Sequence, residues 1–287
     1  MASKWTLTVL RQVFSDTGIR PKKSLGQNFL IDYNLLRFIV AKAGILPTDT
    51  VIEIGAGVGS LTVLLTERAR KVYAFEIDKN LYNICKNYLR ETSNIQLYNE
   101  DVIRAINEGG FVVNTPNIKV VANLPYSKYF EILLSLLTSR LSIRELYLLV
   151  QFDVYKKMSA TVGSKEYSPL SIIVQSLCDI RLIRKVPRDV FYPRPKIISA
   201  FVALKLLDKP LIDRDKIKVI LSPMRTLFSE RKKTIVNVLK KLFKGGSLDR
   251  FSHCIGGDIL QKRVQVLEPQ DVIRVASFIA TVKHISP

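Results

Sequence analysis

The sequence of 287 residues is long enough for one large domain and a smaller one, and its 47% hydrophobic content predicts a folded globular protein. A net charge of +19, from 44 basic and 25 acidic residues, favours a polyanionic partner, either nucleic acid or an anionic membrane surface. The 3 scattered cysteines and 2 histidines near the C-terminus argue against a disulfide framework, a zinc site and histidine-based catalysis. No apolar run is long enough to span a membrane, so we expect a cytoplasmic protein.

The N-terminal region predicts a short helix followed by a basic loop. Leu7, Leu10 and Phe14 have helical spacing, and residues 20–30 read as a loop anchored by Phe29. This region contains no secretory pattern, although its few basic residues leave a mitochondrial presequence open as a weaker alternative. A helix over about residues 32–43 should follow.

From residue 51 onward, strand patterns alternate with helix patterns, which predicts a doubly wound, parallel α/β sheet. Ligands bind such sheets at the carboxyl ends of the strands. The expected strands are residues 51–54, 72–75, 95–98, 119–122 and 146–150, and the expected helices include 60–68, one beginning after Asp78, and 129–137.

Chemically useful residues stand at the ends of four of these strands. The loop Gly55 to Gly59 allows a ligand close to the backbone, but Gly59 comes one residue too early for the dinucleotide fingerprint, which disfavours NAD. We interpret Glu76 as an acceptor for ribose hydroxyls and Asp101 as an acceptor for an adenine amine. Each is ambiguous by itself, as a tight turn or a solvated acid, but their order along the chain predicts a site for an adenosine-containing donor.

The fourth strand runs into Asn123-Leu124-Pro125-Tyr126. Pro125 biases Leu124 toward an extended conformation, which should hold its carbonyl out of a helix. That carbonyl and the Asn123 side-chain oxygen can accept both N–H groups of an aromatic amine and so favour its nucleophilic form, while Tyr126 stacks on the ring. Taken alone, the tetrapeptide is equally compatible with a strand-end turn carrying a core tyrosine.

The rest of the chain predicts the end of the sheet and a helical region. Strands are expected near 180–186 and 197–207, and helices near 169–178, 214–222, 230–243 and 269–282. We place a domain boundary after Leu207. Basic residues outnumber acidic ones six to one between Arg181 and Lys196, and eight to two between Arg225 and Arg250, which favours contact with RNA phosphates.

With these motifs in place, the chain strongly resembles the small-subunit (16S) rRNA adenine dimethyltransferase family, KsgA type, from about Val9 to near the C-terminus. Five stretches carry the resemblance: residues 24–30 (SLGQNFL), 53–57 (EIGAG), 123–126 (NLPY), 191–196 (FYPRPK) and 228–234 (FSERKKT).

The resemblance implies a Rossmann-like, class I S-adenosylmethionine (AdoMet)-dependent methyltransferase sheet in residues 1–207, with an N-terminal extension at 1–30, and a small all-helical RNA-binding domain in residues 208–287. It implies a monomer that dimethylates two adjacent adenines near the 3′ end of small-subunit rRNA during ribosome biogenesis, without a metal. The donor contacts would be Asn28, Leu30, Gly55, Gly57, Glu76, Asp101 and Asn123. The target base would meet Asn123, Leu124, Pro125 and Tyr126, with Phe191 on its opposite face. RNA contacts would include Arg194, Lys196, Arg231, Lys232 and Lys233.

Two departures from the family pattern affect this interpretation. Asp153 replaces the usual glutamate after the fifth strand, and Ser127-Lys128 replaces the usual small polar run after Tyr126. Two alternatives keep the fold: a non-catalytic assembly factor, which should have lost donor or clamp residues, and a methyltransferase of large-subunit rRNA, as in macrolide resistance. The 228–234 stretch and the N-terminal extension favour the small subunit.

Overall fold

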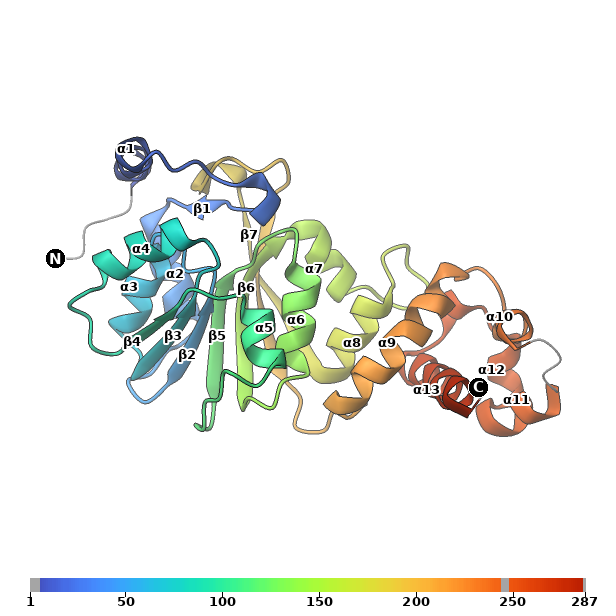
Figure 1. Cartoon of the computed structure of the whole chain (residues 1–287). Coiled ribbons are helices and arrows are strands. Elements are labelled where there is room, and N and C mark those ends of the chain that lie inside the picture. Colours follow the sequence, from blue (N-terminus) through green and yellow to red (C-terminus); the bar gives the residue numbers. More distant parts are fainter. Residues whose placement is uncertain (1–5, 244–247, 286–287) are drawn as a thin grey trace. The chain divides into compact units, whose positions relative to one another are not determined.

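The computed structural model describes residues 6–243 and 248–285. The chain forms two compact units: Met1–Tyr155 with Arg181–Leu206, and Lys156–Ile180 with Leu207–Pro287 (Figure 1). The first unit contains the mixed α/β architecture that the alternating strand and helix patterns predict.

The first unit is built on a seven-stranded sheet with the order β4-β3-β2-β5-β6-β9-β7. Neighbouring strands from β4 to β6 are parallel, and β9 is antiparallel to β6. The chain reverses its direction of travel across the sheet between β2 and β5, which is where ligands bind in such folds. The strands are β2 (Thr50–Ile54), β3 (Lys71–Phe75), β4 (Ile95–Tyr98), β5 (Ile118–Asn123), β6 (Ile143–Gln151), β7 (Cys178–Val186) and β9 (Ser199–Leu206).

Helices cover both faces of this sheet. Buried residues of α2, α3 and α4 share one hydrophobic cluster with Val51 and Val121, while α5 and α6 contact one another on the other face (Figure 1). Successive residues of a strand point to opposite faces, so strands buried on both sides read as continuous apolar runs. The helices of this part of the chain are α2 (Tyr33–Lys42), α3 (Ser60–Thr66), α4 (Lys79–Tyr88), α5 (Val102–Asn107), α6 (Tyr129–Leu137) and α7 (Phe152–Met158).

The N-terminal segment is attached to the first unit by aromatic contacts and a small second sheet. Helix α1 (Leu7–Thr17) packs Phe14 against Phe29 with ring centroids 5.2 Å apart, which confirms the anchoring role predicted for Phe29. Strand β1 (Phe29–Leu30) pairs antiparallel with β8 (Phe191–Tyr192). A turn of 3-10 helix at Lys23–Leu25 precedes β1, and another at Arg188–Val190 precedes β8. This pairing joins the two sequence segments that make up the first unit.

The second unit is helical. It includes residues 156–180, which lie before the boundary that we placed after Leu207, because this segment contacts the residues after Leu207: the Tyr167 hydroxyl donates to the Leu267 carbonyl at 3.0 Å. The Ser171 hydroxyl donates to the Lys157 carbonyl at 2.6 Å, and the Gln175 amide donates to the Met158 carbonyl at 2.9 Å. Helix α8 also contacts α9. The helices are α8 (Pro169–Leu177), α9 (Arg214–Ser229), α10 (Ile235–Leu242), α11 (Leu248–Ile255), α12 (Gly257–Gln261) and α13 (Pro269–Ile285), with a 3-10 turn at Val264–Val266.

Within residues 6–243 and 248–285, no helix combines the length and apolar character that crossing a bilayer requires.

Candidate active site

The loop after β2 is shaped by three glycines with positive φ. Gly55, Gly57 and Gly59 have φ values of 77°, 58° and 90°, which residues with a side chain rarely adopt. A Cβ atom on Gly59 would lie 3.1 Å from the Cys85 sulfur, and one on Gly57 would lie 3.4 Å from the Phe29 ring. The glycines therefore allow both the turn into α3 and its close packing.

Glu76 follows β3 and is held beside this loop. One carboxylate oxygen accepts the Gly57 N–H and the other accepts the Asp78 N–H, each at 2.8 Å. Burial raises the pKa of Glu76, although the two backbone hydrogen bonds act in the opposite direction. Each oxygen keeps a second lone pair with which a ligand hydroxyl can bond.

Asp101 follows β4 and begins α5. Its Oδ1 accepts the Ile103 N–H at 2.9 Å, as in a helix N-cap, and its Oδ2 lies 3.8 Å from the Lys128 ammonium. The capping bond uses one oxygen and leaves the other as the available acceptor. Lys128 is one of the residues that depart from the family pattern. Its ion pair with Asp101 places the ammonium group beside the acceptor oxygen Oδ2.

Asn123 ends β5, and its side-chain amide has a defined orientation. Its Nδ2 donates to the Asn28 carbonyl at 2.8 Å, so Oδ1 remains as an acceptor. The Leu124 N–H donates to the Leu149 carbonyl at 3.1 Å, and the Lys128 N–H closes a turn on the Pro125 carbonyl at 3.2 Å. These bonds fix the turn formed by residues 123–128, with Oδ1 of Asn123 as an acceptor at its start.

Tyr126 is fixed at its hydroxyl end. Its oxygen lies 2.6 Å from the Ser199 hydroxyl oxygen in a hydrogen bond, and burial raises the pKa of Tyr126 while this bond lowers it. The phenol therefore remains neutral at physiological pH, and its ring is available for stacking.

The N-terminal loop closes over these strand ends. Gly26 has φ of 64°, and a Cβ atom there would lie 3.0 Å from the Tyr126 backbone nitrogen. Lys22 forms an ion pair of 2.7 Å with Asp78, to which Gln27 also donates at 3.3 Å. Burial opposes ionisation of Asp78, but the hydrogen bonds from Lys22 and Asn80 lower its pKa overall. The sequence indicated Asp78 only as a helix cap, which it is, and gave no signal for its pairing with Lys22.

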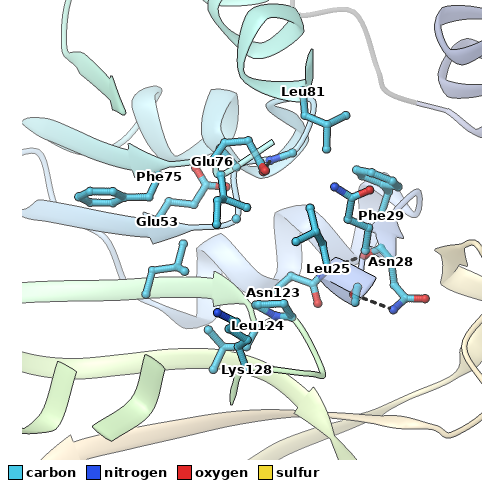
Figure 2. A pocket seen from close by; sticks show the side chains of 18 of the residues that line it. Leu25, Asn28, Phe29, Glu53, Phe75, Glu76, Leu81, Asn123, Leu124 and Lys128 are labelled. Carbon is cyan, nitrogen blue, oxygen red and sulfur yellow. Dashed lines mark hydrogen bonds between the residues drawn. The ribbon is translucent and has the colours of Figure 1, made fainter. Parts of the chain in front are cut away.

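All the residues predicted to contact the donor, and four of the five predicted to contact the target base, line one pocket at the carboxyl ends of the strands. Figure 2 shows Asn123 and Leu124 on one side of it and Glu53 and Glu76 on the other. The predicted residues present are Asn28, Leu30, Gly55, Gly57, Glu76, Asp101, Asn123, Leu124, Pro125 and Tyr126. Sequence reasoning missed most of the apolar lining, which includes Leu25, Phe29, Phe75 and Leu81, and two acids, Glu53 and Glu100.

Phe191 is the exception. Its side chain is 2% exposed, belongs to the hydrophobic cluster that contains Leu30 and Phe201, and is not part of the pocket lining. The reason is the pairing of β8 with β1, which sets Phe191 opposite Leu30 and directs it into the core. The lining of the pocket that includes Tyr126 therefore does not include this ring, and stacking of Phe191 on the target base stays a prediction.

The residues predicted to contact RNA differ in their exposure and in the bonds that their side chains form with other parts of the protein. Lys196 and Lys232 are exposed, and Arg194 pairs with Asp189 at 2.6 Å. Lys233 pairs with Glu230 at 2.9 Å. Arg231 donates to the carbonyls of Ser164 and Lys165 at 2.8 and 2.7 Å, so it holds a loop of the second unit in place. The described residues bring no three His, Cys, Asp or Glu side chains together in an arrangement that could hold a metal ion.

Comparison with known proteins gives a consistent result. The family model described as ribosomal RNA adenine dimethylase matches residues 18–281. A protein of Moorella thermoacetica named ribosomal RNA small subunit methyltransferase A is 39% identical over 244 residues, which are 83% of each chain. A protein of the same name from Clostridium botulinum is 40% identical over 220 residues, covering 77% of this chain and 80% of the relative.

Solved structures share the fold. A dimethyladenosine transferase from Plasmodium falciparum superimposes with a TM-score of 0.71 at 24% identity, covering 85% of this chain and 94% of the other. The 23S rRNA methyltransferase ErmE superimposes with a TM-score of 0.61 at 24% identity, covering 88% and 99%.

Proposed function

The chain belongs to the ribosomal RNA adenine dimethylase family, and we propose that it dimethylates the exocyclic amines of two adjacent adenines near the 3′ end of small-subunit rRNA, using AdoMet. The observation that carries this proposal is the single pocket in which the amide acceptor of Asn123 lies with the glycine loop, Glu76 and Asp101. The names of the relatives favour the small subunit over the large one.

The residues of the pocket suit the methyl donor. Glu76 keeps a lone pair on each oxygen for the ribose hydroxyls, and Asp101 Oδ2 is free of the helix cap and can accept the adenine amine. The backbone at Gly55 and Gly57 allows close approach of the ligand, and Asn28 and Leu30 line the same pocket from the N-terminal segment. AdoMet supplies, when bound, an electrophilic methyl group carried on a sulfonium.

The corner at Asn123 acts on the target amine. The Asn123 Oδ1 and the Leu124 carbonyl accept its two N–H groups and favour the pyramidal form, whose lone pair is available for attack. Tyr126 holds the ring by stacking. The amine becomes cationic and acidic once it has attacked, so water can take the proton and no strong general base is needed. Before the second methylation the amine keeps only one N–H, so only one of the two acceptors forms a hydrogen bond with it.

The proposed partner is folded rRNA within an immature small subunit, bound by a cytoplasmic monomer that requires no metal. A net charge of +19 suits a polyanion, and binding should weaken steeply with salt because each phosphate contact releases counterions.

The modified bases test this function directly. The full-length protein should transfer label from AdoMet to immature small subunits, and mapping should find two methyl groups on each of two adjacent adenines near the rRNA 3′ end. Purified large subunits serve as the control. Label on large-subunit rRNA, or on another base, would contradict the proposal.

Two alanine substitutions should distinguish an arginine that stabilises the fold, Arg231, from a lysine that binds RNA, Lys232. Arg231→Ala removes two charge-assisted hydrogen bonds to carbonyls and should destabilise the second unit by about 1–3 kcal/mol. Lys232→Ala removes an exposed charge and should change the free energy of unfolding by less than about 0.5 kcal/mol, while weakening RNA binding and its dependence on salt. Thermal unfolding and filter binding at two salt concentrations measure both effects. Unchanged unfolding of Arg231→Ala would show that its bonds to the loop carry little stability.

A further inference from the structure

The donor pocket contains a buried acid to which the proposed chemistry assigns no role. Glu53 lies in β2 between Ala74 of β3 and Val121 of β5, and its side chain is 1% exposed. It lines the pocket, where Figure 2 shows it near Glu76. Among the described residues, its Oε2 has no hydrogen-bond partner and no cation forms an ion pair with it.

The two neighbouring acids differ in how their charge is stabilised. Burial raises the pKa of both acids, but Glu76 accepts two backbone N–H groups that favour its ionised form, whereas the Oε2 of Glu53 has no hydrogen-bond partner among the described residues. Burial raises the pKa of Glu53 to about 8; the Thr62 hydroxyl acts against this rise and the Glu76 carboxylate adds to it. Cys85 of α4 is a further titratable group close by, and burial raises its pKa, so its thiol is neutral.

We propose that Glu53 is a proton-linked site for the positive charge of the methyl donor. Its carboxyl group is neutral in the ligand-free protein and releases its proton to solvent when the cationic donor binds. The inference rests on the proposed use of AdoMet, which carries a sulfonium and an ammonium group. A nearby cation stabilises the carboxylate, whereas without one an ionised Glu53 would lie beside a second acid, Glu76, in a poorly solvated space.

This linkage predicts the sign of the pH dependence. Below the pKa of free Glu53 the donor must displace a proton, so its affinity should rise as the pH increases to about 8 and level off above it. With a pKa of about 8, the fraction of protein already ionised is about one hundredth at pH 6 and about one half at pH 8. This contribution should tighten AdoMet binding by up to about 50-fold over that interval.

Calorimetry counts the proton directly. AdoMet is titrated into the full-length protein at pH 7 in buffers of different ionisation enthalpy, with Glu53→Gln as the matched variant of nearly the same shape. The wild type should release about 0.9 proton more than the variant. The donor's own amino group titrates in the same range, but it contributes equally to both proteins and cancels in the difference. Methylthioadenosine, which keeps the nucleoside and lacks both positive charges, should release no proton from the wild type.

The outcomes are distinguishable. AdoMet binding with equal proton release from wild type and Glu53→Gln, or equal release with methylthioadenosine, would overturn the role of Glu53 and leave the proposed function standing. Absence of AdoMet binding to the wild type would overturn the proposed function itself. If Glu53→Gln fails to fold, an infrared difference spectrum of the wild type decides the matter, because addition of AdoMet should remove the C=O stretch of a protonated carboxyl group and its persistence would refute the inference.

Discussion

Asn123→Ala should lower kcat for adenine methylation by about 100- to 1,000-fold, the range seen when one preorganised partner of a transition state is removed. The wild-type side chain has one usable orientation, because its Nδ2 donates to the Asn28 carbonyl at 2.8 Å and leaves Oδ1 as an acceptor. Alanine removes that acceptor from the amine, and the Leu124 carbonyl alone cannot bind both N–H groups. AdoMet binding should weaken only several-fold, since one hydrogen bond contributes about 1 kcal/mol. Single-turnover methylation and calorimetric titration separate the two quantities.

Asn28→Ala is the matched control for this experiment. It removes another asparagine side chain from the same pocket, one whose Nδ2 donates to the Gly26 carbonyl, and keeps the backbone carbonyl that orients Asn123. We expect this variant to bind AdoMet less tightly and to retain most of the single-turnover rate at saturating donor. Equal loss of rate in both variants would show that Asn123 acts by holding the N-terminal loop, and near wild-type turnover of Asn123→Ala would remove the amine clamp from the mechanism.

The pocket could be anticipated because its polar residues lie at or shortly after the ends of short apolar strands. Glu76, Asp101 and Asn123 each come at such an end, and parallel pairing brings those ends to one edge of the sheet. The central strands β2, β5 and β6 could be predicted for a related reason, since segments buried on both faces are largely apolar. A local pattern was therefore enough to predict a long-range assembly.

Contacts between segments distant in sequence could not be predicted from local sequence patterns. The pairing of β1 with β8 turns Phe191 into the core, and nothing local to residues 191–196 signals it. The bonds from Arg231 to the carbonyls of Ser164 and Lys165, and the pairing of Lys22 with Asp78, join segments far apart in the chain. In each case a charged or aromatic residue that suggests ligand binding by its type is used to hold the fold.

Short helices and a tolerated proline account for several further differences in secondary structure. We predicted no helix at α5, α7, α11 or α12, because these helices are too short to show a clear 3.6-residue period. The helix predicted near residues 214–222 stops before Pro223, yet α9 continues through this proline to Ser229. Burial of Met224 and Leu227 after the proline, on the side already occupied by Ile220, stabilises the continuation against the lost hydrogen bond.

Glu53→Gln should stabilise the ligand-free protein, increasingly so as the pH rises. The folded pKa of Glu53 is raised from 4.5 to about 8, so between these values the unfolded chain releases a proton that the folded chain keeps. The wild type therefore loses stability as the pH increases through this window, and the loss levels off above about pH 8. Glutamine cannot ionise and removes this slope. Between pH 5 and pH 8 the variant should gain about 4 kcal/mol relative to the wild type as an upper value.

Urea unfolding of both proteins at several pH values measures the difference in free energy of unfolding. The exposed Glu67, next to α3, offers a matched control: Glu67→Gln removes the same charge where folding buries little of it, so its stability should follow that of the wild type across the window. A Glu53→Gln curve parallel to the wild-type curve would mean that Glu53 is ionised in the folded protein. The raised stability would also be informative in itself, because a buried acid that weakens the free protein and strengthens donor binding is retained for its effect on the ligand.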